Sequence, residues 1–330
     1  MFSLTDGRII AKTDTRQPIV LSIVDPDQIK QGVKQGSGRR VLPKKKKRVV
    51  KKKKPKYRGC GKHPCCRYCH EDYCQEEPCC DNCGIFYDIV QSSSSESEDS
   101  ESEEGGQIGH ISTIGREYIP RSGKLIPLPN FSERFVEYIS GPSGSGKSTV
   151  ASQLAQQFKI MYPQKPIYMF SRTDSKKDPA FQKLRPIQID IDETMIDNPI
   201  DITKEVTEGG CLMIFDDCNT IHNDKVKKEI DKLMSDAMEV GRKLDCNIII
   251  TNHLVIPNEK KFARTMLNEM NMLTIFPKSG SSQQIKYALK TYYGLNNKQI
   301  DKILESPGRW VRISKTYPQY VLNEHGAYIL

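Results

Sequence analysis

The sequence predicts an α/β domain with a mainly parallel sheet over residues 130–330, preceded by a long polar region. Three observations predict this fold class. Short apolar runs alternate with helix-like stretches after residue 130, as in sheets whose parallel strands are joined by helices. A glycine-rich turn separates the first apolar run from the first helix-like stretch. A later apolar run ends in two aspartates, at the strand end where parallel sheets bind ligands.

The individual elements follow from the same periodicities. Strands are expected at 135–140, 166–171, 211–215, 247–251 and 271–276, and helices at 147–160, 223–243, 259–268, 281–291 and 296–305. The final stretch, 310–330, predicts two or three short strands. This domain of roughly 200 residues is long enough to bury a sizeable core.

The N-terminal region divides by composition into three segments that precede this domain. Residues 1–58 are expected to form an extended arm, which includes a polybasic tract at 39–58 with 13 Lys and Arg and no acid. Residues 59–90 are rich in cysteine, and residues 91–129 predict a disordered, acidic, serine-rich linker. The net charge of +9 is therefore concentrated in opposed tracts rather than spread over the chain.

Two further features of the sequence bear on its location. No stretch approaches the ~18 consecutive apolar residues of a membrane span. The first residues lack the basic start and long apolar run of a signal peptide. A soluble, non-secreted protein is expected.

The glycine-rich turn has the composition of a phosphate-binding loop. It consists of Gly141, Pro142, Ser143, Gly144, Ser145, Gly146, Lys147, Ser148 and Thr149. It matches G-x-x-x-x-G-K-[ST] between a strand and a helix, which is the context this motif requires. Glycines let backbone N–H groups approach phosphates, and the helix N-terminus favours the anion. Lys147 can reach the β- and γ-phosphates and Ser148 can bind Mg²⁺, so the motif predicts ATP and Mg²⁺ as ligands.

The ends of two later strands supply the other candidate catalytic residues. Asp216 follows the strand 211–215 and is placed to hold Mg²⁺, while Asp217 is placed to orient or deprotonate the attacking water. At the end of strand 247–251, Asn252 is the first candidate, and His253 the second, for contact with the γ-phosphate or the water. A turn or capping role is the alternative for this strand end.

Two arginines are candidates for an arginine finger in a neighbouring subunit. Arg242 lies at the end of the long charged helix expected at 223–243, and Arg264 lies in the next helix. Such a finger stabilises charge in the transition state of phosphoryl transfer. The alternative is that both are ordinary surface residues.

The cysteine-rich segment predicts zinc. Eight of the 11 cysteines fall between positions 60 and 83. The spacing of two CxxC pairs predicts one tetrahedral Zn²⁺ site. Its ligands would be Cys66, Cys69, Cys80 and Cys83. The remaining cysteines and two histidines suffice for a second ion, and redox-active or disordered cysteines are the alternative.

The polybasic tract at 39–58 allows two interpretations. Lys and Arg at this density attract the phosphate backbone of nucleic acid without reading its sequence. The same composition is also found in nuclear-import signals.

The order of these parts is similar to that of a known family. The sequence resembles the DNA-packaging ATPases of large nucleocytoplasmic DNA viruses, which belong to the FtsK–HerA superfamily. The resemblance lies in the order of the phosphate loop, IFDD, a helix ending in GRK, IIITNH, RTMLN and the strand MLTIFP. The resemblance covers about 130–330. In this sequence Asp217 stands where many relatives have Glu, and Asn252 or His253 where the strand-end residue is often Gln.

The resemblance implies a homo-oligomeric ring that moves double-stranded DNA into a capsid during ATP hydrolysis. It also implies contacts with capsid or membrane-associated virion proteins, and a location in the virion and the host cytoplasm. Nuclear entry would follow only from the polybasic tract.

Two alternative functions stay open. The first is a P-loop kinase acting on a nucleotide or another small phosphate acceptor, and the second is a nucleotide-gated binding module that hydrolyses slowly.

Overall fold

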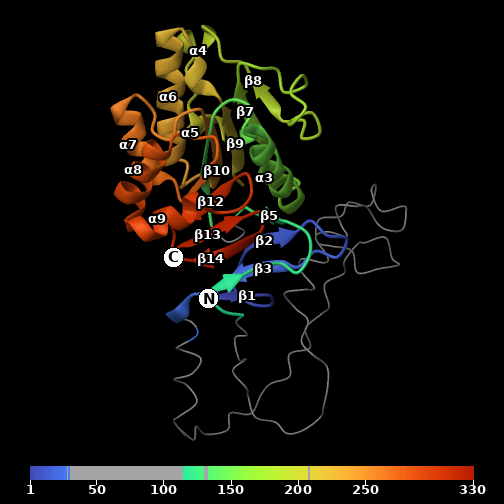
Figure 1. Ribbon diagram of the computed structural model, residues 1–330. Helices are drawn as coiled ribbons and strands as arrows, with labels where there is room; N and C mark the ends of the chain where they lie inside the picture. The colour runs from blue at the N-terminus through green and yellow to red at the C-terminus, as the bar shows by residue number, and fades with distance from the viewer. Residues whose placement is uncertain (28, 30–113, 130–132, 207–208) are drawn as a thin grey trace, which may run out of the picture.

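The structure is a computed structural model that describes residues 1–27, 29, 114–129, 133–206 and 209–330. A ten-stranded sheet runs through most of this part of the chain, and a four-stranded sheet packs beside one end of it (Figure 1). The strand order of the large sheet is β4-β14-β13-β12-β11-β6-β10-β9-β7-β8. No helix among the described residues is long and apolar enough to cross a membrane.

Six neighbouring strands of the large sheet are parallel. They are β6 (Val136–Ser140), β7 (Ile167–Ser171), β8 (Ile187–Ile189), β9 (Cys211–Asp216), β10 (Cys246–Asn252) and β11 (Met272–Ile275). The predicted mainly parallel sheet is thereby confirmed, and the sequence missed only the short, partly exposed β8. Because all six strands run the same way, their carboxyl ends meet at one edge of the sheet.

Helices cover both faces of the parallel strands. They are α3 (Lys147–Met161), α4 (Thr194–Asp197), α5 (Ile202–Glu205), α6 (Asp224–Glu239), α7 (Lys260–Glu269), α8 (Ser282–Tyr293) and α9 (Asn297–Leu304). In Figure 1, α3 lies on one face and α6 to α9 lie on the other. The strands alternate accordingly. Leu212 and Ile214 of β9 pack in the core on the α3 side, whereas Met213 and Phe215 pack in the core that includes α6.

The other half of the large sheet is antiparallel. It is formed by β12 (Val311–Ser314), β13 (Tyr320–Asn323), β14 (Gly326–Ile329) and β4 (Glu117–Tyr118). The expectation of two or three short strands at 310–330 is confirmed. Since β12 is antiparallel to β11, the start of β12 lies at the edge where the parallel strands end.

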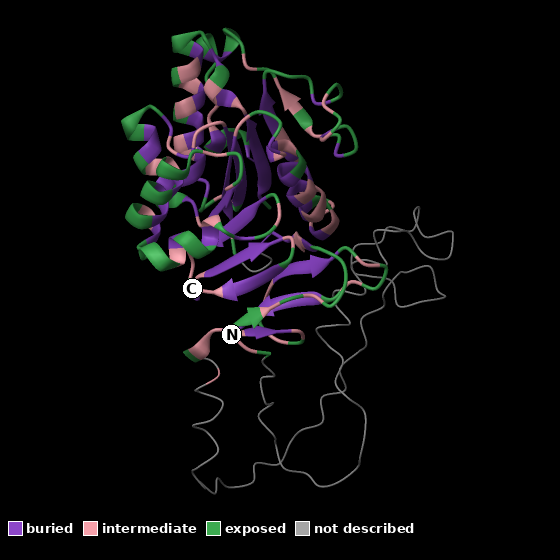
Figure 2. Cartoon of the chain, viewed as in Figure 1, coloured by how far each residue is buried: buried purple, intermediate pink, exposed green. Residues whose placement is uncertain are grey.

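The N-terminal residues differ from the prediction. Residues 2–23, expected within an extended arm, form β1 (Phe2–Ser3), β2 (Arg8–Thr13) and β3 (Val20–Ile23). They make a sheet in the order β1-β3-β2-β5, in which β2 pairs with β5 (Leu125–Pro127). Phe2, Ile10 and Leu21 are buried in the same core as α3, so this sheet belongs to the folded domain (Figure 2). The linker expected at 91–129 is likewise wrong for the strands β4 and β5.

These N-terminal strands escaped prediction because two to six residues are too few to establish a period. The polybasic tract, the cysteine-rich segment and the acidic serines fall within 30–113, outside the described residues.

A fully buried ion pair joins the two halves of the large sheet. Glu137 of β6 and Arg312 of β12 are 0% and 1% exposed, and Arg312 Nη2 donates to Glu137 Oε2 over 2.8 Å. Thr274 of β11, the strand between them, donates to Glu137 Oε1 over 2.6 Å, and Arg312 Nη1 donates to the Leu128 carbonyl over 2.9 Å. Burial alone would lower the pKa of Arg312, but the adjacent Glu137 charge raises that pKa overall.

Removing one member of this pair should destabilise the domain strongly. Glu137→Gln leaves the Arg312 guanidinium buried without its anion, and we expect a loss of about 3–5 kcal/mol in the free energy of unfolding, measured by urea denaturation. The matched control is Asp301→Asn. Asp301 lies 3.2 Å from Lys286, both side chains being about half exposed, and its change should lower stability by less than ~1 kcal/mol. Equal losses for both variants would contradict a special role for the buried pair.

Candidate functional site

The predicted phosphate-binding loop lies between β6 and α3. Gly146 precedes the first turn of α3 and has a φ of 110°, a backbone conformation that residues other than glycine rarely adopt. A side chain at Gly141 would come within 2.7 Å of both Phe276 and Ser145 Oγ. Both glycines are therefore required by the local geometry. They leave the loop compact and place Lys147 as the first residue of the helix.

The Lys147 side chain reaches back across the loop toward the ends of two other strands. It is only 5% exposed, and Nζ donates to the Pro142 carbonyl over 3.4 Å. The same nitrogen lies 3.7 Å from Asp217 Oδ1 and 3.5 Å from His253 Nδ1. The structure thus brings together three residues that the sequence placed on separate elements.

Thr251 of β10 holds the acidic pair in place. Its hydroxyl lies 2.8 Å from Asp216 Oδ1 and 3.3 Å from Asp217 Oδ1, and it accepts the Asp217 backbone N–H over 3.0 Å. Asp217 has φ 48°, in the left-handed region. This strained backbone is also held by Thr220, whose N–H and hydroxyl both donate to the Asp217 carbonyl. Thr251 was not predicted, although its place beside Asn252 at the end of an apolar strand is a signal that could have found it.

Asp216 is the more buried of the two carboxylates. Burial, with a smaller contribution from the charges of Asp217 and Asp178, raises the pKa of Asp216 to about 6, despite the hydrogen bond from Thr251. Among the described residues, no basic side chain forms an ion pair with Asp216. A buried carboxylate without a direct ion-pair partner, near only the positive charge of Lys147, fits the oxygen ligand that Mg²⁺ requires. Ser148, on the first turn of α3, is the second predicted ligand, and Mg²⁺ would supply the positive charge at the phosphates.

Of the two residues predicted at the end of β10, His253 is the one whose side chain faces Asp217. Its Nε2 lies 3.3 Å from Asp217 Oδ2, while its Nδ1 faces the Lys147 ammonium. A carboxylate only accepts and an ammonium only donates, so the neutral tautomer protonated on Nε2 satisfies both. Asn252, the first candidate, is buried, and its Oδ1 accepts the Leu254 N–H in a turn.

Arg309 is a site residue that the sequence did not reveal. It lies just before β12, and its Nη2 donates to the Ser145 carbonyl in the phosphate loop over 3.2 Å. The Arg309 backbone N–H is fixed by Glu324 Oε2 over 2.8 Å. The signal would have been a basic residue at the start of a strand antiparallel to the others, because such a strand begins at the edge where the parallel strands end.

The remaining predicted residues lie elsewhere. Arg242 lies before the first residue of β10, at the opposite edge of the sheet from the phosphate loop, and Arg264 is exposed on α7. In the described part of the chain, neither arginine forms a hydrogen bond or ion pair with the phosphate loop, so a finger role for either would be in another subunit. The predicted zinc ligands Cys66, Cys69, Cys80 and Cys83 lie outside the described residues.

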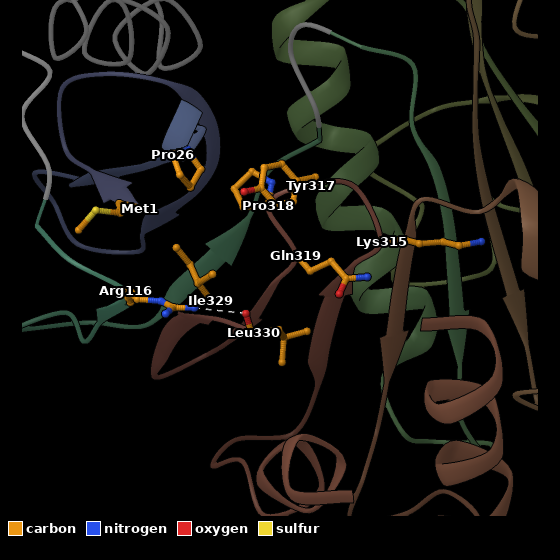
Figure 3. Close-up of a pocket in the computed structure, with 9 residues that line it drawn as sticks. All are labelled: Met1, Pro26, Arg116, Lys315, Tyr317, Pro318, Gln319, Ile329 and Leu330. Atoms are coloured by element: carbon orange, nitrogen blue, oxygen red, sulfur yellow. Dashed lines mark hydrogen bonds between the residues drawn. The ribbon is translucent and has the colours of Figure 1, made fainter. Parts of the chain in front are cut away.

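A cavity of about 550 Å³ lies away from this site, beside the β12–β13 connection (Figure 3). Its charged side chains are already engaged. Arg116 donates to the Leu330 carbonyl, and Lys315 Nζ donates to the carbonyls of Leu267 and Asn268 at the end of α7. With its basic groups paired in this way, the cavity offers no chemistry comparable to that of the phosphate loop.

The fold and the site define a P-loop NTPase. A phosphate loop follows β6, the acidic pair stands at the end of β9, and β10 with its polar end lies between the two strands. No protein-family model matches the chain. The chain is 40% identical over 211 residues to protein V3 of the Sputnik virophage, an uncharacterized protein, and the match covers 64% of this chain and 83% of V3. The chain therefore belongs to the same protein family as V3, and this relative is viral, as the resemblance implied.

Solved structures show only partial likeness. The genome packaging NTPase B204 of Sulfolobus turreted icosahedral virus 2, in complex with AMPPCP, matches with a TM-score of 0.39 and 11% identity, covering 58% of this chain and 98% of B204. EssC (ATPases 2 and 3) of Geobacillus thermodenitrificans matches with a TM-score of 0.41 and 16% identity, covering 63% of this chain and 40% of EssC. Overall similarities this small establish no activity. The assignment to the P-loop NTPases therefore rests on the phosphate loop and the strand order of this chain itself.

The pKa of Asp216 predicts that a neutral substitution stabilises the protein. The ordinary pKa of this carboxyl, 3.8, applies in the unfolded chain, whereas burial raises its pKa to about 6 in the folded protein, so above pH 6 the folded state must hold a disfavoured charge. Asp216→Asn keeps an oxygen for Thr251 but removes the charge. At pH 8, without Mg²⁺ and nucleotide, we expect the free energy of unfolding to rise by up to about 3 kcal/mol.

The gain in the free energy of unfolding should shrink as the pH falls through 6. It should vanish below about 4, where the Asp216 carboxyl is neutral in both the folded and the unfolded state. Thermal or urea unfolding across this pH range measures it. Asp217→Asn is the matched control: it weakens contacts with Lys147 and His253 and should not stabilise the protein. A lower stability of Asp216→Asn at pH 8 would show that the charge of Asp216 is well compensated.

Proposed function

We propose that this protein is an ATP-hydrolysing motor that packages viral double-stranded DNA. The observation that carries the hydrolytic part is the meeting of Lys147, Asp217 and His253 at the end of the phosphate loop. The viral part is supported by the motif order described above and by the membership of the chain in the family of a virophage protein. Its place of action would be the virion or the infected cell.

The chemistry follows from the position of each side chain. Lys147 is oriented by the Pro142 carbonyl and supplies positive charge where phosphate oxygens become more negative. Asp217 is about a third exposed, so one face of its carboxylate is open to a water molecule while Thr251, His253 and Lys147 fix the other contacts. This arrangement suits a base or orienting group for the attacking water, a role in which side chains contribute about 10²–10⁴-fold.

Movement of DNA would require several copies of the chain. A homo-oligomeric ring would bring an arginine of one subunit to the nucleotide of the next, and Arg242 and Arg264 are the candidates. Both are exposed, which is a necessary condition for such a contact. Arg309, by contrast, lies against the phosphate loop of its own chain and would add positive charge there without a neighbour.

The segment before the described domain would add two binding functions. The polybasic tract at 39–58 would hold DNA through its phosphates, with nuclear import as the alternative role, and the cysteines would bind Zn²⁺. We expect the purified full-length protein to contain one or two zinc ions per chain by elemental analysis. Changing Cys66 and Cys80 to Ser should lower that content, whereas changing the buried Cys218 to Ser should not. Zinc-free protein with freely reactive thiols would contradict the zinc assignment.

ATP turnover with and without double-stranded DNA tests the proposed function. Lys147→Ala should abolish hydrolysis, because the charge that stabilises the transition state is lost, while the circular dichroism spectrum stays that of the wild type. DNA should raise the wild-type turnover. Lys147→Ala turnover close to the wild-type rate would contradict the site. Transfer of phosphate to a nucleoside monophosphate instead of water would favour the kinase.

Asp217→Asn provides the comparison within the same site. It should bind ATP with near wild-type affinity but hydrolyse it about 10²-fold more slowly or worse, since it lacks the base. Asp216→Asn should instead weaken Mg²⁺-dependent binding. Equal loss of nucleotide binding in both variants would contradict this division of roles.

A further inference from the structure

The connection between β7 and β8 is an exposed basic loop that begins at the edge of the sheet that holds the acidic pair and runs back to the start of β8. Ser171, the last residue of β7, is the register partner of Asp216 in the neighbouring strand β9. The loop therefore leaves the sheet beside the acidic pair, and in Figure 1 it projects outward next to β8. Its basic residues are all exposed: Arg172, Lys176, Lys177, Lys183 and Arg185.

The basic loop (residues 172–185) carries five basic and two acidic side chains, which give it a net charge of +3. Asp174 Oδ1 accepts the Lys176 N–H, and Asp178 Oδ1 accepts the Ala180 N–H, so both loop carboxylates shape the turn. Within the described part of the chain, no carboxylate forms a salt bridge with any of the five basic side chains. They therefore present a surface of positive charge to a partner.

The basic loop is held firmly on the domain. Phe181 is fully buried and Leu184 nearly so, and the Ala180 carbonyl accepts the hydroxyl of Ser152 on α3. Gln188 of β8 accepts the Ser175 N–H and donates to the Ser171 carbonyl. The exposed cations thus stand on a packed scaffold rather than on a loose chain. The large apolar side chains of the loop, Phe181 and Leu184, are buried, so the exposed face of the loop is mostly polar and charged.

A short chain of hydrogen bonds connects the basic loop to the acidic pair. Arg172 Nη1 donates to the Thr220 carbonyl over 2.9 Å. Thr220 in turn donates to the Asp217 carbonyl through its N–H over 3.1 Å and its hydroxyl over 2.9 Å. Thr220 ends the short 3₁₀ helix η2 (Cys218–Thr220), which begins immediately after Asp217. A displacement of Arg172 would therefore act on the strained backbone of Asp217.

We propose that the basic loop docks the phosphate backbone of double-stranded DNA, and that Arg172 and Thr220 transmit this docking to Asp217. The inference rests on the proposed function, which it extends by naming the docking surface and its link to hydrolysis. Duplex DNA offers about one negative charge per 1.7 Å of its axis, which suits a group of exposed Lys and Arg side chains. Arg172 acts here as a positioning residue, since it reaches Asp217 only through Thr220.

The test measures ATP turnover of the full-length protein against the concentration of a double-stranded DNA duplex, at about 0.15 M salt. Lys176→Glu with Lys183→Glu should raise the half-saturating DNA concentration about tenfold, because two phosphate contacts become repulsive. The matched control is Lys290→Glu with Lys298→Glu, on α8 and α9 on the other face of the sheet. This control reverses the same number of exposed charges and should respond to DNA like the wild type.

Arg172→Ala tests the link to hydrolysis. It should lower the maximal stimulation by DNA about fivefold or more, the scale of a coupling between two sites, while the half-saturating DNA concentration changes much less. Arg172→Lys keeps the charge and one donor and should restore part of the stimulation. A structural defect alone would lower the rates with and without DNA by the same factor, and would leave their ratio unchanged.

The outcomes separate the two proposals. If DNA stimulates the wild type, but the Lys176/Lys183 variant responds like its control, the docking surface is wrong and the motor function stands. The loop variants could instead differ from the wild type only in how turnover depends on protein concentration, with the same response to DNA. In that case the loop contacts a neighbouring subunit, and the inference is overturned. If DNA does not stimulate the wild type at all, both the inference and the DNA-coupled function are wrong.

Discussion

The buried ion pair between Glu137 and Arg312 fixes the frame on which the nucleotide site depends. It spans β11 and so determines how the antiparallel half of the sheet is aligned with the parallel half. Arg309 lies three residues before Arg312, and its contact with the Ser145 carbonyl requires that alignment. A buried charge pair of this kind adds less to net stability than its Coulomb attraction suggests, because both groups lose water. What it adds is a single register, since any slip of β12 would leave a charge buried alone.

The catalytic edge is organised around Thr251 rather than around either aspartate. One hydroxyl contacts both carboxylates and also accepts the backbone N–H of Asp217. The hydroxyl therefore couples the position of the predicted metal ligand to that of the predicted base. A strand-end threonine can do this only because β10 lies between β6 and β9, so that its end faces the phosphate loop and the acids together.

Sequence reasoning predicted five of the six parallel strands because each of them is an apolar run flanked by a glycine, a helix or a polar turn, whereas β8 is short and partly exposed. The phosphate loop and the acidic pair were found for the same reason: their residue types are required by the chemistry and stand at strand ends. The small N-terminal sheet was not predicted, because its strands are short and its partner β5 lies about a hundred residues further along.

Thr251 and Arg309 were missed for a different reason. Their roles arise from neighbours in space, and neither residue type is distinctive where it stands.

The site retains two features that oppose folding, and both concern the acidic pair. Asp216 is buried as a carboxylate whose pKa is raised, mainly by burial, to about 6, and Asp217 holds a left-handed backbone conformation. Each would be relieved by a small change, to Asn at the first position or to Gly at the second. A carboxylate poor in positive partners attracts a metal ion more strongly than one already paired. A strained turn held by a few hydrogen bonds can be shifted by a modest force on Thr220. The features that lower stability are therefore the ones that let this edge bind a cation and respond to a partner.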